Sequence, residues 1–138
     1  MKISIKENNK NVKEFNLLYN LVGWGAYDEK ISKKALDNTF YSISVYDEDK
    51  IIGYGRIIGD IICFMHICDI MVIPEYQSKK IGTLIMNKLL EKIEELKKEN
   101  KSLRVYLGAS KGKEKFYEKF GFIKRTNADL GAGMILKH

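Results

Sequence analysis

Residues 77–83, QSKKIGT, form a basic turn whose composition suits an anion-binding site. A strand-like apolar run ends before it at Pro74, and a helical pattern begins within it. The first N–H groups of a helix lack intrahelical partners, and the helix dipole adds positive charge there. Lys79 and Lys80 raise the local potential, and Gly82 lets a phosphate approach the backbone. The turn predicts a phosphate site, with an ordinary solvated connection as the alternative. The expected contacts come from Gln77, Ser78, Lys79, Lys80, Ile81, Gly82 and Thr83.

His66 is the side chain best suited to move a proton. It precedes the turn on an apolar, strand-like run, and its near-neutral pKa suits a general base. Side chains alternate along a strand, so Cys68 should share its face, whereas Asp69 should point the other way unless a bulge intervenes. Cys63 should also point away, so we expect no metal site. A hydrogen-bonded core histidine is the alternative reading of His66.

The hydrophobic patterns place these residues in a mixed α/β domain. Strands are expected at 2–7, at two segments within 40–60, and at 61–73, 103–108, 122–125 and 133–138. Helices are expected at 11–24, 29–38, 80–99 and 111–121. The order is βααβββαβαββ, a mixed central sheet flanked by about four helices. We expect one domain over residues 1–138.

Composition narrows the class of protein. A hydrophobic content of 45% and a charged content of 30% are typical of a soluble globular protein. We find no apolar run of membrane-spanning length and no signal-peptide pattern, so we expect a cytoplasmic protein without a membrane partner. The net charge of +6 allows a nucleic-acid or phosphorylated partner. We expect no nucleic-acid binding, since the usual motif spacings are absent.

Two motifs resemble those of the GNAT N-acetyltransferase superfamily. "VIPEYQSKKIGTLIM" resembles its acyl-CoA-binding motif, and "FYEKFGF" at 116–122 resembles its second, C-terminal motif. The resemblance covers essentially the whole chain and implies the GNAT fold with acetyl-CoA as cofactor. One departure is that Lys80 stands where the family has its first glycine, while Thr83 stands where it usually has Gly or Ala. We expect this departure to affect how tightly the cofactor binds.

The resemblance also implies roles for single residues. The N–H of Ile70 would polarise the thioester carbonyl, and the backbone of Met71 and Val72 would pair with the pantetheine arm. Tyr117 would be the general acid toward the CoA sulfur, unless it is a core aromatic. His66 falls eleven residues before Gln77, where similar enzymes place a Glu or His base. A water molecule is the alternative base.

The acceptor wall is expected in the N-terminal half, again by resemblance. Trp24 and Tyr27 lie in a glycine-containing loop and are suited to contact an aromatic or cationic amine. Trp24 capping the core is the competing interpretation. Cys68 occupies a place where the family often has a second polar residue. Arg56 is expected to pair with an acidic substrate group, with Asp60 or with Asp69.

Together these features predict transfer of an acetyl group from acetyl-CoA to a primary amine of a small molecule, by direct attack in a ternary complex. Two alternatives stay open: acetylation of a protein N-terminus or lysine, and a non-catalytic CoA-binding module. Family members are often dimers, so a homodimer is one assembly that we consider.

Overall fold

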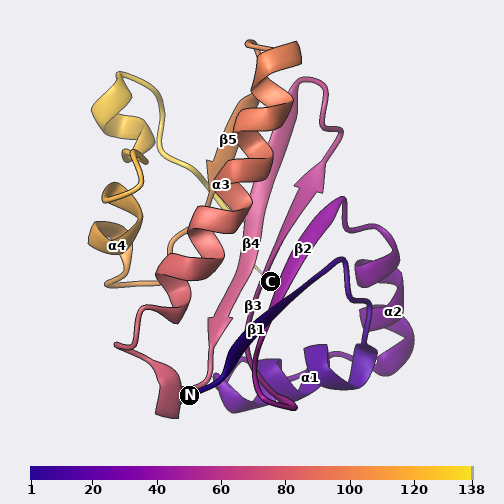
Figure 1. Ribbon diagram of the computed structural model, residues 1–138. Helices are drawn as coiled ribbons and strands as arrows, with labels where there is room; N and C mark the ends of the chain where they lie inside the picture. Colours follow the sequence, from indigo (N-terminus) through magenta and orange to yellow (C-terminus); the bar gives the residue numbers. More distant parts are fainter. Residues whose placement is uncertain (138) are drawn as a thin grey trace. The chain divides into compact units, whose positions relative to one another are not determined.

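A computed structural model describes residues 1–137, which cluster into two compact units. The first unit runs from Met1 to Tyr106, and the second takes the rest of the chain from Leu107. The first unit contains β1 (Ile3–Glu7), α1 (Val12–Leu21), α2 (Glu29–Asp37), β2 (Tyr41–Asp47), β3 (Lys50–Gly59), β4 (Phe64–Val72), a 3-10 turn (Pro74–Tyr76), α3 (Ile81–Glu99) and nearly all of β5 (Arg104–Leu107) (Figure 1). The second contains α4 (Glu114–Glu118) and a 3-10 turn (Arg125–Ala128).

The strands form one sheet in the order β1-β2-β3-β4-β5. The pairs β1–β2, β2–β3 and β3–β4 are antiparallel, so consecutive strands lie side by side. At the start of β5, the amide of Arg104 donates to the carbonyl of Cys63 at 3.1 Å. The expected mixed α/β fold, with its central sheet and four helices, is confirmed.

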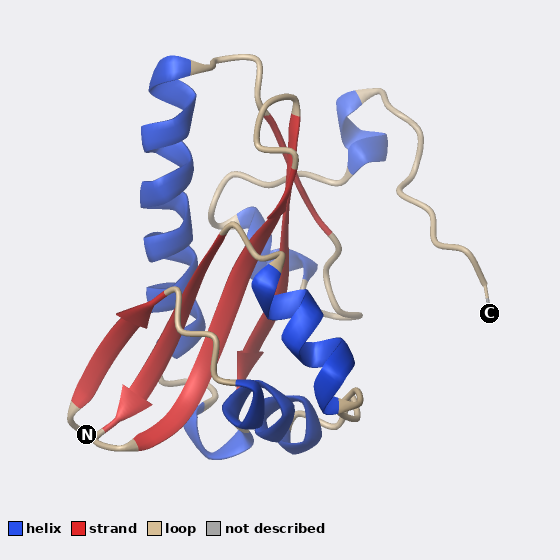
Figure 2. Cartoon of the chain, turned by 90° about the vertical axis from the view of Figure 1, so that its right-hand side faces the viewer, coloured by secondary structure: helices blue, strands red, loops and turns tan. Residues whose placement is uncertain are grey.

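Helices cover both faces of this sheet (Figure 2). The first helix, α1, contacts β3 and β4, whereas α3 packs on β2, β3 and β4 from the other face. Burying a large apolar side chain contributes roughly 1.5–3 kcal/mol, so α3 is held mainly by its apolar stripe. The buried members of that stripe are Ile81, Ile85, Met86, Leu89 and Ile93. The predicted helix over 80–99 is thereby confirmed.

The start of β4 differs from the prediction of a strand over 61–73. Asp60 accepts hydrogen bonds from the amides of Ile62, Cys63 and Phe64 at 2.9–3.0 Å. Ile61 has a φ of 63°, which no extended strand adopts. These contacts make a tight turn of residues 60–64, so β4 begins at Phe64.

The strands predicted at 122–125 and 133–138 are wrong for the described residues. A 3-10 turn takes up Arg125–Ala128, and residues 131–137 have no regular structure. Met134, Ile135 and Leu136 are 92%, 94% and 88% exposed, so this apolar run packs on nothing that would fix it as a strand. Residue 138 lies outside the described residues. The predicted helix at 111–121 forms only as Glu114–Glu118.

Candidate active site

The predicted anion-binding turn leads from β4 into α3. Ser78 and Lys80 both adopt left-handed backbone conformations, with φ of 63° and 66°. Lys80 is the N-cap residue of α3 and makes no side-chain cap hydrogen bond. The amide of Leu84 donates to the carbonyl of Lys80 at 3.0 Å. The amides of residues 81–83 come before this first bond of the helix. This is the backbone geometry that favours an anion at a helix N-terminus.

Side chains tie this turn to the sheet and keep it basic. The side-chain amide of Gln77 donates to the carbonyl of Val72 at 3.0 Å. The ammonium of Lys79 lies 5.6 Å from the centre of the Tyr76 ring, and Tyr76 donates to Asp47. Lys79 and Lys80 are exposed, and the first turn of α3 contains no acidic residue. The two residues that immediately precede α3 therefore carry positive charge.

A β-bulge interrupts β4 at Asp69 and Ile70, and Ile70 lies seven residues before Gln77, the first residue of the turn. The register with β3 shifts between Tyr54 and Arg56, which pair with Met71 and Cys68. Two residues of β4, Asp69 and Ile70, therefore lie opposite one residue of β3. Asp69 has a φ of 55°, the left-handed conformation often found at the first position of such a bulge. The bulge coincides with the amide that the family resemblance singles out.

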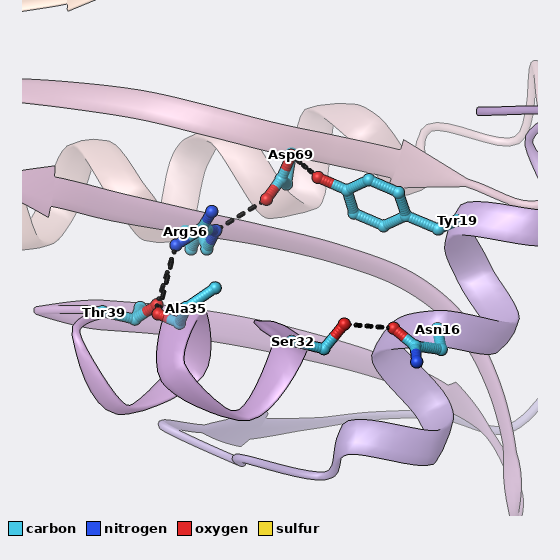
Figure 3. Close-up of polar contacts among 7 residues, drawn as sticks. All are labelled: Asn16, Tyr19, Ser32, Ala35, Thr39, Arg56 and Asp69. Atoms are coloured by element: carbon cyan, nitrogen blue, oxygen red, sulfur yellow. Dashed lines mark hydrogen bonds and ion pairs between the residues drawn. The ribbon is translucent and has the colours of Figure 1, made fainter. Parts of the chain in front are cut away.

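The bulge overturns strict alternation at Asp69. Its carboxylate accepts from Arg56 Nε at 2.6 Å and from the Tyr19 hydroxyl at 2.5 Å (Figure 3). Arg56 pairs with Cys68 in the register, so these two side chains share one face of the sheet. Asp69 binds Arg56, and its side chain therefore points to the same face as Cys68. Of the partners considered for Arg56, the structure selects Asp69, and Asp60 instead binds backbone amides of its own turn.

His66 and Cys68 are both partly buried on β4. Burial lowers the pKa of His66 below its usual 6.5, and the nearby Asp69 carboxylate opposes this effect. The imidazole is therefore neutral at pH 7 and able to accept a proton. Burial raises the pKa of the Cys68 thiol to about 11, so this side chain is a neutral thiol. Cys63 is exposed in the turn before the strand.

Two exposed aromatic rings pack beside Tyr19 on the first unit. The rings of Trp24 and Tyr27 lie 5.4 Å and 5.5 Å from the Tyr19 ring. Trp24 is 48% exposed and Tyr27 is 54% exposed, so Trp24 is not a fully buried core residue. Burial and the hydrogen bond to Asp69 raise the pKa of Tyr19, which keeps its hydroxyl a proton donor. A chain of contacts thus links the aromatic rings to the bulge.

Tyr117 belongs to the second unit. It lies in α4 with its ring 5.0 Å from that of Phe116, which in turn lies 5.2 Å from Phe120. Burial raises the pKa of Tyr117, so the phenol is protonated at neutral pH. Both of its interpretations, a general acid and a core aromatic, are compatible with these surroundings.

The first unit thus joins His66, Cys68, the bulge at Ile70, the amides of Met71 and Val72, and the basic turn along one stretch of chain. Sequence analysis expected Asp69 to point away from the His66 face unless a bulge intervened, and it did not single out Tyr19. The available signal was an aspartate inside an otherwise apolar strand, in ICDIMVI. Within residues 1–137, no group of His, Cys, Asp and Glu is placed to hold a metal ion. Among the helices described, none has the length and apolar character needed to span a bilayer.

Comparison with known proteins places this geometry among acetyltransferases. The sequence model of the acetyltransferase (GNAT) domain matches residues 13–136. An uncharacterized N-acetyltransferase, ycf52-like, from Prochlorococcus marinus is 31% identical over 113 residues. That match covers 79% of this chain but only 61% of the relative, so the chain spans about three fifths of its length.

Two solved structures share the whole fold. A structure from meticillin-resistant Staphylococcus aureus, described as a probable acetyltransferase of unknown function, has a TM-score of 0.85 and 30% identity, and the match covers 99% of both chains. A GNAT family acetyltransferase from Streptococcus pneumoniae has a TM-score of 0.81 and 26% identity, with 99% of this chain and 98% of that chain covered.

Proposed function

The chain belongs to the GNAT acetyltransferase family, and from that premise we propose that it transfers an acetyl group from acetyl-CoA to a primary amine of a small molecule. The family resemblance carried by the two sequence motifs is thereby confirmed. The observation that carries the proposal is the uncapped N-terminus of α3, preceded by the left-handed residues Ser78 and Lys80. This helix is the next one longer than a single 3-10 turn after the bulged strand β4. Anion site and bulge are the two parts that a thioester of CoA would need.

The proposed cofactor site runs from the turn to the bulge. The CoA diphosphate accepts hydrogen bonds from the amides of residues 81–83, and Lys79 and Lys80 neutralise its charge. Gln77 supports the turn through its bond to the Val72 carbonyl. The pantetheine arm pairs with the backbone of Met71 and Val72 in the manner of an added strand. Since these contacts are made by backbone groups, side-chain variants of the two strand residues would affect them little.

The proposed reaction needs three groups besides the cofactor. The amine nitrogen attacks the thioester carbon, and the N–H of Ile70 stabilises the negative charge that develops on the carbonyl oxygen. His66, neutral at pH 7, accepts the proton that the amine loses, directly or through water. The C–S bond then breaks, and Tyr117 gives its proton to the departing CoA sulfur. The lowered pKa of His66 keeps the imidazole neutral at pH 7, and the raised pKa of Tyr117 keeps the phenol protonated, which are the forms in which these two roles begin.

The proposed acceptor site uses the rings beside α1. Trp24 and Tyr27 expose aromatic faces, which attract a cationic or aromatic amine before it loses its proton. Cys68 adds a neutral thiol on the His66 side of β4. A small amine is the acceptor that we infer, since these contacts involve a few side chains of one loop.

The proposal is tested with purified protein and acetyl-CoA. Calorimetry should detect acetyl-CoA binding, and thiol release should accelerate with at least one member of a panel of small primary amines. The control is the same panel without protein. Binding without turnover on any small amine, protein N-terminus or lysine peptide would favour a non-catalytic CoA module. Absence of acetyl-CoA binding would overturn the assignment.

Tyr117→Phe tests the general acid separately. The change removes one hydroxyl and keeps the ring among its aromatic neighbours, so the fold should survive. We expect kcat to fall roughly 10²-fold or more, as is typical of losing a positioned proton donor, with acetyl-CoA affinity little changed. Phe116→Tyr, which adds a hydroxyl on the neighbouring ring, is the matched control and should leave wild-type kcat within a few-fold. Full turnover by Tyr117→Phe would remove the residue from the mechanism.

A further inference from the structure

We propose that Asp69, held by Arg56 and Tyr19, is a positioning residue that fixes the β4 bulge and so aims the amide of Ile70 at the thioester carbonyl. This inference rests on the proposed function. It concerns a polar cluster on one face of the sheet, the Asp69 clamp, which consists of Asp69, Arg56 and Tyr19 (Figure 3).

The bulge places Asp69 in an unfavourable backbone conformation, which contacts from other residues have to stabilise. Asp69 has a φ of 55°, a region that L-residues enter at a cost and glycine enters freely. Aspartate tolerates it better than most residues, yet extended conformations stay available to it. A return of Asp69 to extended backbone would shift the register and turn the neighbouring Ile70 amide away from its present direction. Side-chain contacts must therefore select the bulged form.

The carboxylate of Asp69 is held at both of its oxygens. Arg56 Nε donates to Oδ2 at 2.6 Å and the Tyr19 hydroxyl donates to Oδ1 at 2.5 Å. These donors come from β3 and α1, so the carboxylate is fixed from two different elements. The side chains of Arg56 and Asp69 are only 13% and 11% exposed, which protects the ion pair from solvent screening.

Arg56 is itself anchored to α2 and to the segment that follows it. One of its terminal nitrogens, Nη1, lies 3.1 Å from the Thr39 hydroxyl and 3.4 Å from the carbonyl of Ala35. The guanidinium also lies 5.8 Å from the centre of the Phe15 ring on α1. The position of the bulge is thus tied to both helices on that face of the sheet.

On the opposite face of the sheet, the side chain of Ile70 packs against Gly55 and α3. A Cβ built on Gly55 would meet Ile85 Cγ2 at 2.6 Å and Ile70 Cδ1 at 2.7 Å. The Ile70 side chain therefore occupies space that the glycine leaves open, beside α3. Its backbone is held between this contact and the clamp on the other face.

A purely structural role for the ion pair is the competing explanation. A buried ion pair contributes little net stability compared with an apolar pair, so stability alone is a weak reason for it. Placement at the single residue before the proposed carbonyl-binding amide is what points to positioning. The two explanations differ in whether the variants alter the bound thioester or only the stability of the fold.

The experiment uses Asp69→Asn and acetyl-CoA labelled with ¹³C at the thioester carbonyl. Asparagine keeps the shape and tolerates left-handed backbone, but it loses the charge and one acceptor for Arg56 and Tyr19. In the wild type, hydrogen bonding by Ile70 should displace the carbonyl ¹³C resonance on binding. In Asp69→Asn, this displacement should shrink and kcat should fall roughly 10-fold to 100-fold, part of the 10²–10³ typical of losing such a donor outright. The affinity for CoA without an acetyl group should change less than about twofold, since residues 77–83 are untouched.

Three further variants keep the test decisive. Tyr19→Phe removes only the second hydrogen bond and should change ¹³C displacement and kcat in the same direction, by less. Arg56→Lys keeps the charge and should restore part of the kcat that Arg56→Gln loses. Ile57→Val removes one methylene from a fully buried position of β3 and is the control for lost stability, with unchanged displacement and kcat.

The outcomes separate this inference from the proposed function. No binding and no displacement in the wild-type protein would overturn the proposed function and this role with it. A wild-type displacement that Asp69→Asn leaves intact, together with an intact kcat, would overturn the clamp alone. If Ile57→Val lowers kcat as much as Asp69→Asn does, the effect is one of stability, and the clamp is again overturned.

Discussion

Lys80 shows what one residue can change at the anion-binding turn. Its φ of 66° favours glycine, and the resemblance implies glycine at this position. Lys80→Gly should raise the free energy of unfolding by about 1 kcal/mol, because left-handed backbone costs an L-residue roughly that much. Urea unfolding of the ligand-free protein would measure it.

The control for Lys80→Gly is the same change at the neighbouring position. Lys79 lies outside the positive-φ region, so Lys79→Gly loses the same charge without relieving strain and should lower stability through backbone entropy. If both variants gained stability equally, loss of charge rather than backbone strain would be the cause. Comparing acetyl-CoA affinity in the two variants then tells whether the Cβ of Lys80 hinders the diphosphate.

His66 gives a pH dependence whose sign follows from its surroundings. Burial lowers the pKa of His66 below 6.5, so the proposed base is neutral at pH 7 and becomes protonated only in more acidic solution. The value of kcat/KM should be level with respect to this group above pH 6.5 and should fall as pH drops through the lowered pKa. His66→Gln should lose this acid limb and reduce kcat/KM roughly 10²-fold or more. The pH profile of both proteins is the measurement.

The same residue should affect stability. The unfolded histidine binds its proton at a higher pH than the folded one, so the free energy of unfolding should decline as pH falls below about 6.5. His66→Gln should lack that contribution. An acid limb that persists unchanged in the kinetics of His66→Gln would assign the base to a water molecule and another group.

Asp69 marks the limit of prediction from single positions. Alternation along β4 assigns its face correctly only if the strand is regular, and the bulge depends on a residue from another strand. Gly55 leaves the space that Ile70 fills, and Arg56 supplies the charge, yet both are more than ten positions away in the sequence. His66 and Gln77, by contrast, were identifiable as candidates because their signals are local: residue type and motif spacing.

At the scale of elements, the close approach of α3 to the sheet depends on Gly55. A Cβ there would meet Ile85, Ile70 and Leu89 at 2.6–3.2 Å. Gly55→Ala should therefore lower the free energy of unfolding by about 1–3 kcal/mol, the usual cost of overpacking, and should disturb the bulge. Chemical denaturation measures the first effect, and acetyl-CoA turnover measures the second.

Gly108→Ala is the matched control, because nothing lies within 4 Å of a Cβ at that position and its φ is not positive. It should change stability by a few tenths of a kcal/mol in either direction. Equal losses at the two glycines would show that backbone freedom, rather than the contact with α3, governs Gly55.

Elements were predictable where one local pattern decides them. The repeat of Ile81, Ile85, Leu89 and Ile93 fixes both the existence and the buried face of α3. The start of β4 was mispredicted because the Asp60 carboxylate captures three amides, a side-chain contact that hydropathy does not encode. The two C-terminal strands were mispredicted because alternation supplies a face but not a neighbouring strand, and a strand needs both.

For the whole molecule, the question is whether its net charge of +6 or the local charge of the turn would attract the proposed cofactor, acetyl-CoA. Exposed charges act over about 8 Å at physiological ionic strength. Lys79 lies in the turn, whereas Lys98 lies near the far end of the 19-residue α3, about 25 Å away at 1.5 Å per residue. Of these two lysines, only Lys79 is close enough to contribute strongly to the proposed binding of CoA.

Lys79→Gln should therefore weaken acetyl-CoA binding several-fold at low salt and reduce the slope of log Kd against log [NaCl]. Lys98→Gln lowers the net charge by the same amount and should leave both nearly unchanged. Calorimetric titrations at several NaCl concentrations would measure the slopes. Equal effects of the two variants would mean that the field of the whole molecule attracts the cofactor. A difference confined to Lys79 would assign the attraction to the turn where β4 passes into α3.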